Sequence, residues 1–152
     1  MADKREQGFE WVEDMKDFNK ELEPRILEAN QDDTKIKWRD LLPDLMDAEI
    51  LMIGQFADNK ETGEKQLNLL MMQKDGKIAV PFFTSPDKMG AFANQNQSKF
   101  DVIKMETSAF FRSIAGKAAV MNPMTTYSRI FTPFEITILT AEYAERNPDK
   151  KQ

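Results

Sequence analysis

The sequence predicts a soluble α/β protein of the α+β kind, with a mixed β-sheet of about five strands, N-terminal helices, two β-α-β crossovers and a C-terminal helix. Three observations predict it. Apolar residues near the start recur at helical spacing, residues 49–121 alternate strand-like apolar runs with turn and helix-start signals, and a strong helix start follows at residue 132. The length of 152 residues fits one domain.

The first part of the chain is predicted to be helical. One apolar stripe recurs at spacings of three and four residues: Phe9, Val12, Met15, Phe18, Leu22 and Ile26. Pro24 interrupts the stripe, so we expect two helices that divide near Leu22. Packing on the core is the ordinary interpretation of such a stripe. The alternative is an arm that binds a partner through Phe9 and Trp11. A further short helix is predicted over residues 36–45.

A three-stranded meander is predicted next. Residues 49–54 form its first strand and residues 66–73 its second. The Asp75–Gly76 pair is the strongest short signal for a hairpin. The third strand, residues 77–83, is apolar almost throughout, as expected of a strand covered on both faces.

Two crossovers are predicted after the meander. Ser85, followed by a proline, is typical of a helix start, and a fourth strand is predicted over residues 100–105. Thr107 or Ser108 begins the next helix, which leads into a fifth strand over residues 117–121. Crossovers imply parallel pairs and hairpins imply antiparallel ones, so we expect a mixed sheet.

The last helix has the best-marked start in the chain. Thr132 is a typical N-cap, Pro133 occupies the first helical position, and Glu135 stands three residues after the cap. Phe131 and Ile136 occupy the positions of a hydrophobic staple.

The composition excludes several kinds of chemistry. The chain has neither histidine nor cysteine, so it lacks the commonest general base, a thiolate nucleophile and the usual ligands of zinc. We therefore expect no cofactor, no metal site and no catalytic residue. The net charge of −5 argues against binding nucleic acid. No apolar run approaches the ~20 residues that cross a bilayer, and no signal segment is evident, so the expected location is cytoplasmic.

Four segments carry a resemblance to a known family. They are residues 78–85, residues 100–105, residues 120–123 with the sequence Val-Met-Asn-Pro, and residues 131–136. In this order they resemble the N-terminal domain of the SseB family, named for enhanced serine sensitivity. The resemblance implies a bacterial domain for which no catalytic activity is established. Related domains occur as single modules, some near secretion or toxin genes.

The resemblance also divides the chain. Residues 1–18 are expected to be a helical extension, residues 19–146 the SseB N-terminal-like domain, and residues 147–152 a polar tail.

Candidate binding residues follow the predicted strands. Ligands of sheets with parallel crossovers tend to bind beyond the carboxyl ends of the strands, where two helix N-termini would also point. The candidates are Thr84, Ser85, Thr107, Asn122, Pro123, Met124, Tyr127 and Arg129. A small anion or the carboxylate of a partner is the expected ligand. Most of these positions also have a structural interpretation, since Ser85 suits a helix cap and Asn122 with Pro123 suits a turn.

Three functions remain open from the sequence. The leading hypothesis is a non-enzymatic, protein-binding accessory or regulatory module. The alternatives are an immunity protein that neutralises a bacterial toxin by direct binding, and a small-ligand binder or enzyme that uses the strand-end cleft. The expected partner is a protein, with no nucleic acid and no membrane, and a homodimer through Phe9 or Trp11 is also open.

Overall fold

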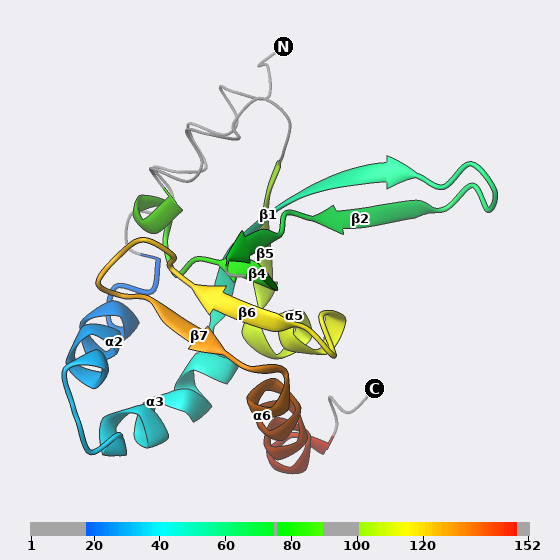
Figure 1. The fold of residues 1–152 in the computed structure, drawn as a ribbon. Helices are drawn as coiled ribbons and strands as arrows, with labels where there is room; N and C mark the ends of the chain where they lie inside the picture. Colours follow the sequence, from blue (N-terminus) through cyan, green and yellow to red (C-terminus); the bar gives the residue numbers. More distant parts are fainter. Residues whose placement is uncertain (1–17, 75, 90–100, 149–152) are drawn as a thin grey trace.

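The fold consists of two β-sheets and the helices that cover them (Figure 1). The computed structural model describes residues 18–74, 76–89 and 101–148. Its helices are α2 (Leu22–Asn30), α3 (Ile36–Asp47), α5 (Thr107–Ser113) and α6 (Pro133–Arg146). Its strands are β1 (Glu49–Asp58), β2 (Lys65–Leu69), β3 (Met72–Lys74), β4 (Lys77–Phe82), β5 (Asp101–Glu106), β6 (Ala118–Met121) and β7 (Arg129–Phe131).

The strands are divided between the sheets by their pairing. The first sheet has the order β2-β1-β5 and is antiparallel throughout, and its β1–β2 hairpin projects from the body of the molecule (Figure 1). The second has the order β3-β4-β6-β7, with a parallel β4–β6 pair between two antiparallel pairs. A β-bridge between Leu51 and Phe83 joins the two sheets. The α+β class is therefore confirmed, and the second sheet is mixed as expected. The strands form two sheets of three and four rather than one of about five, because the segment expected as one strand over residues 66–73 divides into β2 and β3, which pair in different sheets.

The path of the predicted crossovers is wrong in one respect. The strand expected between them, β5, pairs antiparallel with β1 in the first sheet and contacts neither β4 nor β6 as a neighbour. Its alternation explains the difference, because Ile103 and Met105 turn toward the core beside Met52 and Ile50. Such a half-exposed strand suits the edge of an antiparallel sheet better than the middle of a covered parallel one. The chain thus passes from β4 to its parallel neighbour β6 through β5 and α5.

The predicted helix starts are confirmed at α5 and α6. The first residue of α5 is Thr107. At α6 the backbone N–H of Glu135 donates to Thr132 Oγ1 at 3.1 Å, and Pro133 occupies the first position. Phe131 and Ile136, on either side of this cap, are both buried. The cap therefore fixes where α6 leaves β7 and how it packs.

Four phenylalanines form the centre of the main core. Phe82 of β4 lies with its ring centroid 5.2 Å from that of Phe110, 5.8 Å from that of Phe111 and 5.9 Å from that of Phe131. These rings come from β4, α5 and β7, and α2, α3 and α6 pack around them. A smaller cluster, made by Leu51, Ile53, Phe83 and Met89, lies where the two sheets meet.

Some predicted features lie outside the described residues. They are Phe9, Trp11 and the rest of the apolar stripe before Phe18, Asp75 of the hairpin signal, and the end of the tail from residue 149. The helical extension, its role as an arm or dimer contact, and the division into residues 1–18, 19–146 and 147–152 stay predictions.

The start of α3 carries a pH-dependent contribution to stability. The side chain of Asp32 accepts hydrogen bonds from Thr34 Oγ1 at 2.7 Å, Thr34 N at 3.1 Å and Lys37 N at 3.1 Å. The Thr34 hydroxyl is the main cause that lowers the pKa of the Asp32 carboxyl, and the Lys37 amide adds to it. A lowered pKa in the folded state means that stabilisation is present above the ordinary pKa and lost as the pH falls through the lowered one.

We expect Asp32→Asn to destabilise the protein at neutral pH and to have a smaller effect in acid. Chemical unfolding of both proteins, from neutral pH down to about pH 2, measures the difference in the free energy of unfolding. A difference that stays constant over this range would contradict the assignment.

Candidate functional site

The predicted strand-end residues meet at the carboxyl ends of β4 and β6. The backbone N–H of Thr84 donates to Asn122 Oδ1 at 3.0 Å, and Asn122 Nδ2 donates to Thr84 Oγ1 at 3.0 Å. Thr84 and Asn122 are fully buried, and Ser85 is nearly so. The parallel pairing of β4 with β6 places these residues side by side, as the strand-end argument predicts.

Helix α2 contributes an acidic residue that sequence reasoning missed. Glu23 Oε2 accepts hydrogen bonds from Thr84 Oγ1 at 2.5 Å and from Ser85 Oγ at 2.9 Å. Lys88 Nζ lies 3.5 Å from Glu23 Oε1 and 4.2 Å from the centre of the Tyr127 ring. We call Glu23, Thr84, Ser85, Lys88 and Asn122 the strand-end cluster. No local sequence signal could have placed Glu23 there, because it lies 61 residues from Thr84.

The hydrogen bonds of the strand-end cluster connect parts of this chain to one another. Asn122 Nδ2 also lies 3.4 Å from the backbone oxygen of Tyr127. Asn19 Nδ2 donates to the backbone oxygens of both Glu49 and Thr84 at 2.8 Å. Within the described part of the chain, every buried side-chain nitrogen or oxygen has a hydrogen-bond partner. The cluster therefore joins α2 to the ends of β4 and β6, and its polar groups are already satisfied.

The other candidates are spread over separate places. Thr107 is buried at the start of α5, where its backbone N–H and its hydroxyl both donate to the Ala48 oxygen, at 2.9 and 3.1 Å. Pro123 is buried in the turn after β6. Met124, in the same turn, is exposed and has a φ of 66°. Ligand binding by these residues and by the strand-end cluster stays a prediction.

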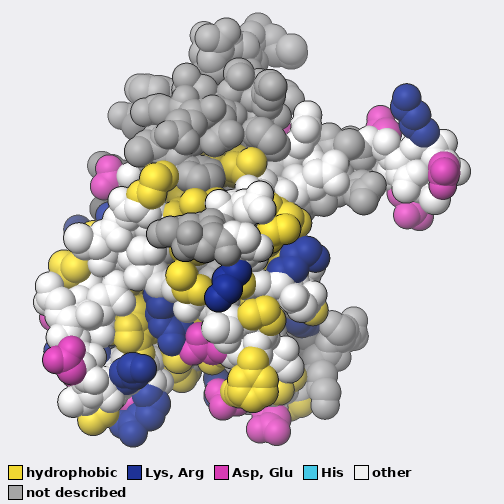
Figure 2. Space-filling model, in the orientation of Figure 1, with side chains coloured by type: hydrophobic (Ala, Val, Ile, Leu, Met, Phe, Trp, Pro, Cys, Tyr) yellow, Lys and Arg dark blue, Asp and Glu magenta, His cyan; other side chains and the backbone are white. Residues whose placement is uncertain are grey.

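A groove lies between α3 and α6, on another part of the molecule. Its volume is about 810 Å³. Trp38, Leu42 and Met46 line it from α3, and Ile138 and Leu139 line it from α6. We call it the α3–α6 groove. Figure 2 shows the surface hollowed between the part that carries α2 and α3 and the part that carries α6.

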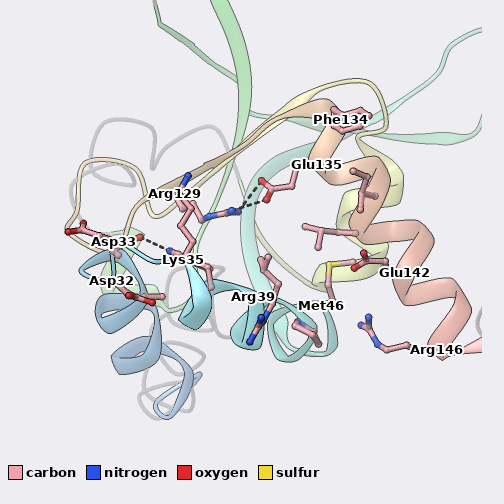
Figure 3. Close-up of a pocket in the computed structure, with 17 residues that line it drawn as sticks. Asp32, Asp33, Lys35, Arg39, Met46, Arg129, Phe134, Glu135, Glu142 and Arg146 are labelled. Atoms are coloured by element: carbon pink, nitrogen blue, oxygen red, sulfur yellow. Dashed lines mark hydrogen bonds and ion pairs between the residues drawn. The ribbon is translucent and has the colours of Figure 1, made fainter.

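Arg129 is the predicted binding residue that lines the α3–α6 groove. Its guanidinium donates to both carboxylate oxygens of Glu135, at 3.1 and 2.8 Å (Figure 3). The same group lies 4.6 Å from the centre of the Trp38 ring and 4.3 Å from that of Phe131. A bidentate, ring-stacked arginine is strongly constrained in position. It holds the start of α6 against β7 and α3, and so fixes one wall of the groove.

The rim of the α3–α6 groove carries an exposed aromatic ring and separated charges. Phe134, in the first turn of α6, is 76% exposed, and Ile138, one turn further on, is 41% exposed. The charged rim residues are Asp32, Asp33, Lys35, Arg39, Glu142 and Arg146 (Figure 3). An apolar floor with a charged rim is the usual composition of a protein-binding surface.

Neither a metal cluster nor a membrane-spanning helix occurs among the described residues. No group of three or more acidic side chains in this part of the chain is arranged to hold a metal ion. None of the helices of the described ranges combines the length and hydropathy needed to cross a membrane.

Comparison with known proteins identifies the family. No curated protein and no solved structure matches the chain. The family model described as SseB protein N-terminal domain matches residues 22–137, which is most of the chain and includes every element from α2 to the start of α6. The predicted resemblance is thereby confirmed, and the chain belongs to the SseB family through its N-terminal domain.

Proposed function

We propose that this chain is a non-enzymatic protein-binding module of an accessory or regulatory kind, and that the α3–α6 groove is its binding surface. The observation that carries the proposal is the exposure of Phe134 and Ile138 beside an apolar groove of about 810 Å³. Exposed apolar side chains that gather beside a hollow are typical of protein-interaction sites.

The arrangement fits the energetics of protein recognition. Aromatic side chains at the centre of an interface, surrounded by polar groups that exclude water, contribute most of the binding energy. Phe134 lies at the rim of the groove beside the constrained Arg129–Glu135 pair, where a partner that fills the groove would also cover its ring. A groove between two helices accepts an apolar segment of a partner along its length.

The strand-end cleft has weaker support as a binding site. Both hydroxyls of its cluster, on Thr84 and Ser85, donate to Glu23, and the amide of Asn122 is shared with Thr84 and the backbone. A ligand that bound there would have to break these buried hydrogen bonds before it formed its own. The α3–α6 groove is therefore better supported as a binding site than the strand-end cleft, and protein binding is better supported than the binding or conversion of a small ligand.

The test compares two double variants that exchange exposed apolar residues for serine. The groove variant is Phe134→Ser with Ile138→Ser, and the control is Met71→Ser with Ile78→Ser, which lie away from the groove and are about half exposed. Tagged chains are purified from the native cell, and stoichiometric partners other than the chain itself are quantified. We expect the control to retain its partner. The amount of partner recovered with the groove variant should fall about tenfold or more.

Two outcomes would overturn the proposal. One is that the unaltered chain recovers no stoichiometric partner. The other is that the folded groove variant, checked by circular dichroism, retains the partner as well as the control does.

A further inference from the structure

We propose that residues 1–17 form a helix that packs beside Phe18 on the face of the joined sheets opposite the main core, and covers an apolar surface there. The sequence leaves open whether this segment packs on the domain or serves as an arm for a partner. The inference selects the first. It does not rest on the proposed function, because the α3–α6 groove lies between helices that cover the other face of the sheets.

The first argument is that the joined sheets have two apolar faces. Successive residues of a strand point to opposite faces. In β1, Ile50 and Met52 belong to the main core. Leu51 and Ile53, which alternate with them, belong to the smaller cluster, and the bridge from Leu51 to Phe83 continues this cluster into the second sheet. Helices α2, α3, α5 and α6 cover the first face, and we call the second the outer face.

The outer face carries apolar side chains that are partly exposed. Val102 of β5 lies directly opposite Ile53 and is 40% exposed. Leu70, whose backbone N–H donates to the Ile53 oxygen at 2.9 Å, is only partly buried, and so is Met72. The solvent side of an antiparallel sheet normally carries polar residues. An apolar side therefore indicates that another element covers it.

The second argument is the place at which the chain reaches the outer face. Phe18 packs against the smaller cluster. The next residue, Asn19, donates from Nδ2 to the backbone oxygens of Glu49 and Thr84, both at 2.8 Å, so its position is fixed. Its φ of 57° lies in the left-handed region, which commonly ends a helix and which asparagine adopts more readily than most residues. A helix that ends at Phe18 therefore has its last turn at the outer face.

The third argument is the pattern of residues before Phe18. Trp11, Met15 and Phe18 follow one another at spacings of four and three, which places them on one side of a helix. Glu13 and Lys16 fall on the opposite side. A helix over residues 1–17 is about 25 Å long and neighbouring strands lie about 4.8 Å apart, so it can cross several strands. The side that carries Phe18 thus brings Met15 and then Trp11 over the outer face.

The contact gives the helix a role as an internal cover. A single helix of this length is marginally stable in water, so its formation depends on the surface against which it packs. Without it, the apolar residues around Ile53 would be open to association with other chains. The helix keeps the outer face unavailable to a second copy or a partner unless it is displaced.

The test uses the fluorescence of Trp11 in the full chain. Trp11 and Trp38 are its two tryptophans, so Trp38→Phe leaves Trp11 as the single reporter. We expect acrylamide to quench Trp11 at least about threefold less in the folded chain than in urea, because packed side chains leave no room for the quencher. If circular dichroism shows that Trp38→Phe does not fold, the difference in quenching between the unaltered chain and Trp11→Phe gives the same measure.

Two further variants locate the contact. Val102→Glu places a charge in the outer face, and we expect it to raise the quenching of Trp11 nearly to the value in urea. Ile36→Glu makes the same charge change at a residue that is 49% exposed at the start of α3, and it should leave the quenching unchanged. Both replaced side chains are partly exposed, so both variants should stay folded.

Three results would each overturn the inference. The first is that Trp11 is quenched equally in the folded chain and in urea. The second is that its protection persists in the folded Val102→Glu variant. The third is that its protection is lost on dilution below about 1 μM, which would assign the cover to a second copy. The Phe134→Ser/Ile138→Ser variant should keep Trp11 protected whether or not it loses a partner, so the inference and the proposed function fail separately.

Discussion

Replacing Asn122 with alanine is expected to lower the free energy of unfolding by about 3–5 kcal/mol. Asn122 is fully buried, and its side chain exchanges two hydrogen bonds of 3.0 Å with Thr84. Alanine would leave the Thr84 N–H buried without that acceptor, and an unsatisfied buried donor costs roughly 1–3 kcal/mol. It would also have to adopt the φ of 47° that Asn122 has, which costs most residues other than glycine about 1–2 kcal/mol.

Two companion variants separate these causes. Asn122→Gly removes the same side-chain hydrogen bonds, but glycine adopts the positive φ without strain. It should therefore be less destabilising than Asn122→Ala by about 1 kcal/mol. Asn59→Ala removes two side-chain hydrogen bonds in the exposed hairpin turn and should cost about 1 kcal/mol or less. Urea unfolding of all three measures the differences. Equal effects of Asn122→Ala and Asn59→Ala would mean that the strand-end cluster does not hold the fold together.

The strand-end cluster shows how far the sequence predicts a site. Thr84, Ser85 and Asn122 follow apolar strands, and parallel neighbours end at the same edge, so their meeting is predictable. The wrong prediction for β5 does not affect this meeting of residues, because β4 and β6 are parallel neighbours whichever path the chain takes between them. The burial of these residues was not predictable, since it depends on Glu23 and Asn19, whose hydrogen bonds reach across 61 and 65 residues.

The other features that the sequence could not predict are either very short elements or contacts between segments far apart in the chain. Strand β7 has three residues, which is too short for a periodic pattern to be recognised. The α3–α6 groove forms between helices that lie about ninety residues apart in the chain. The signals for both helices, including the cap at Thr132, are local and were correct. Nothing local specifies that the two helices leave a gap, or that Phe134 faces solvent beside it.

Phe82→Ala is expected to lower the free energy of unfolding by about 3–5 kcal/mol, the range for removing a large aromatic side chain from a packed core. Phe82 is fully buried, and its ring contacts three others within 5.9 Å. The loss combines the apolar surface no longer buried with the cavity left behind. Because the rings come from β4, α5 and β7, the surrounding elements are linked through this one side chain and cannot all close the gap.

Phe134→Ala is the matched comparison, because it removes the same atoms from a side chain that is 76% exposed. We expect a change within about 0.5 kcal/mol in the free energy of unfolding, measured by urea. The contrast is informative for function as well as for packing. If Phe134→Ala destabilised the monomer as Phe82→Ala does, Phe134 would be part of the core and the groove would lose its anchor. If Phe134→Ala leaves the free energy of unfolding unchanged, the ring of Phe134 does not stabilise the fold. That is the property expected of an exposed side chain that binds a partner.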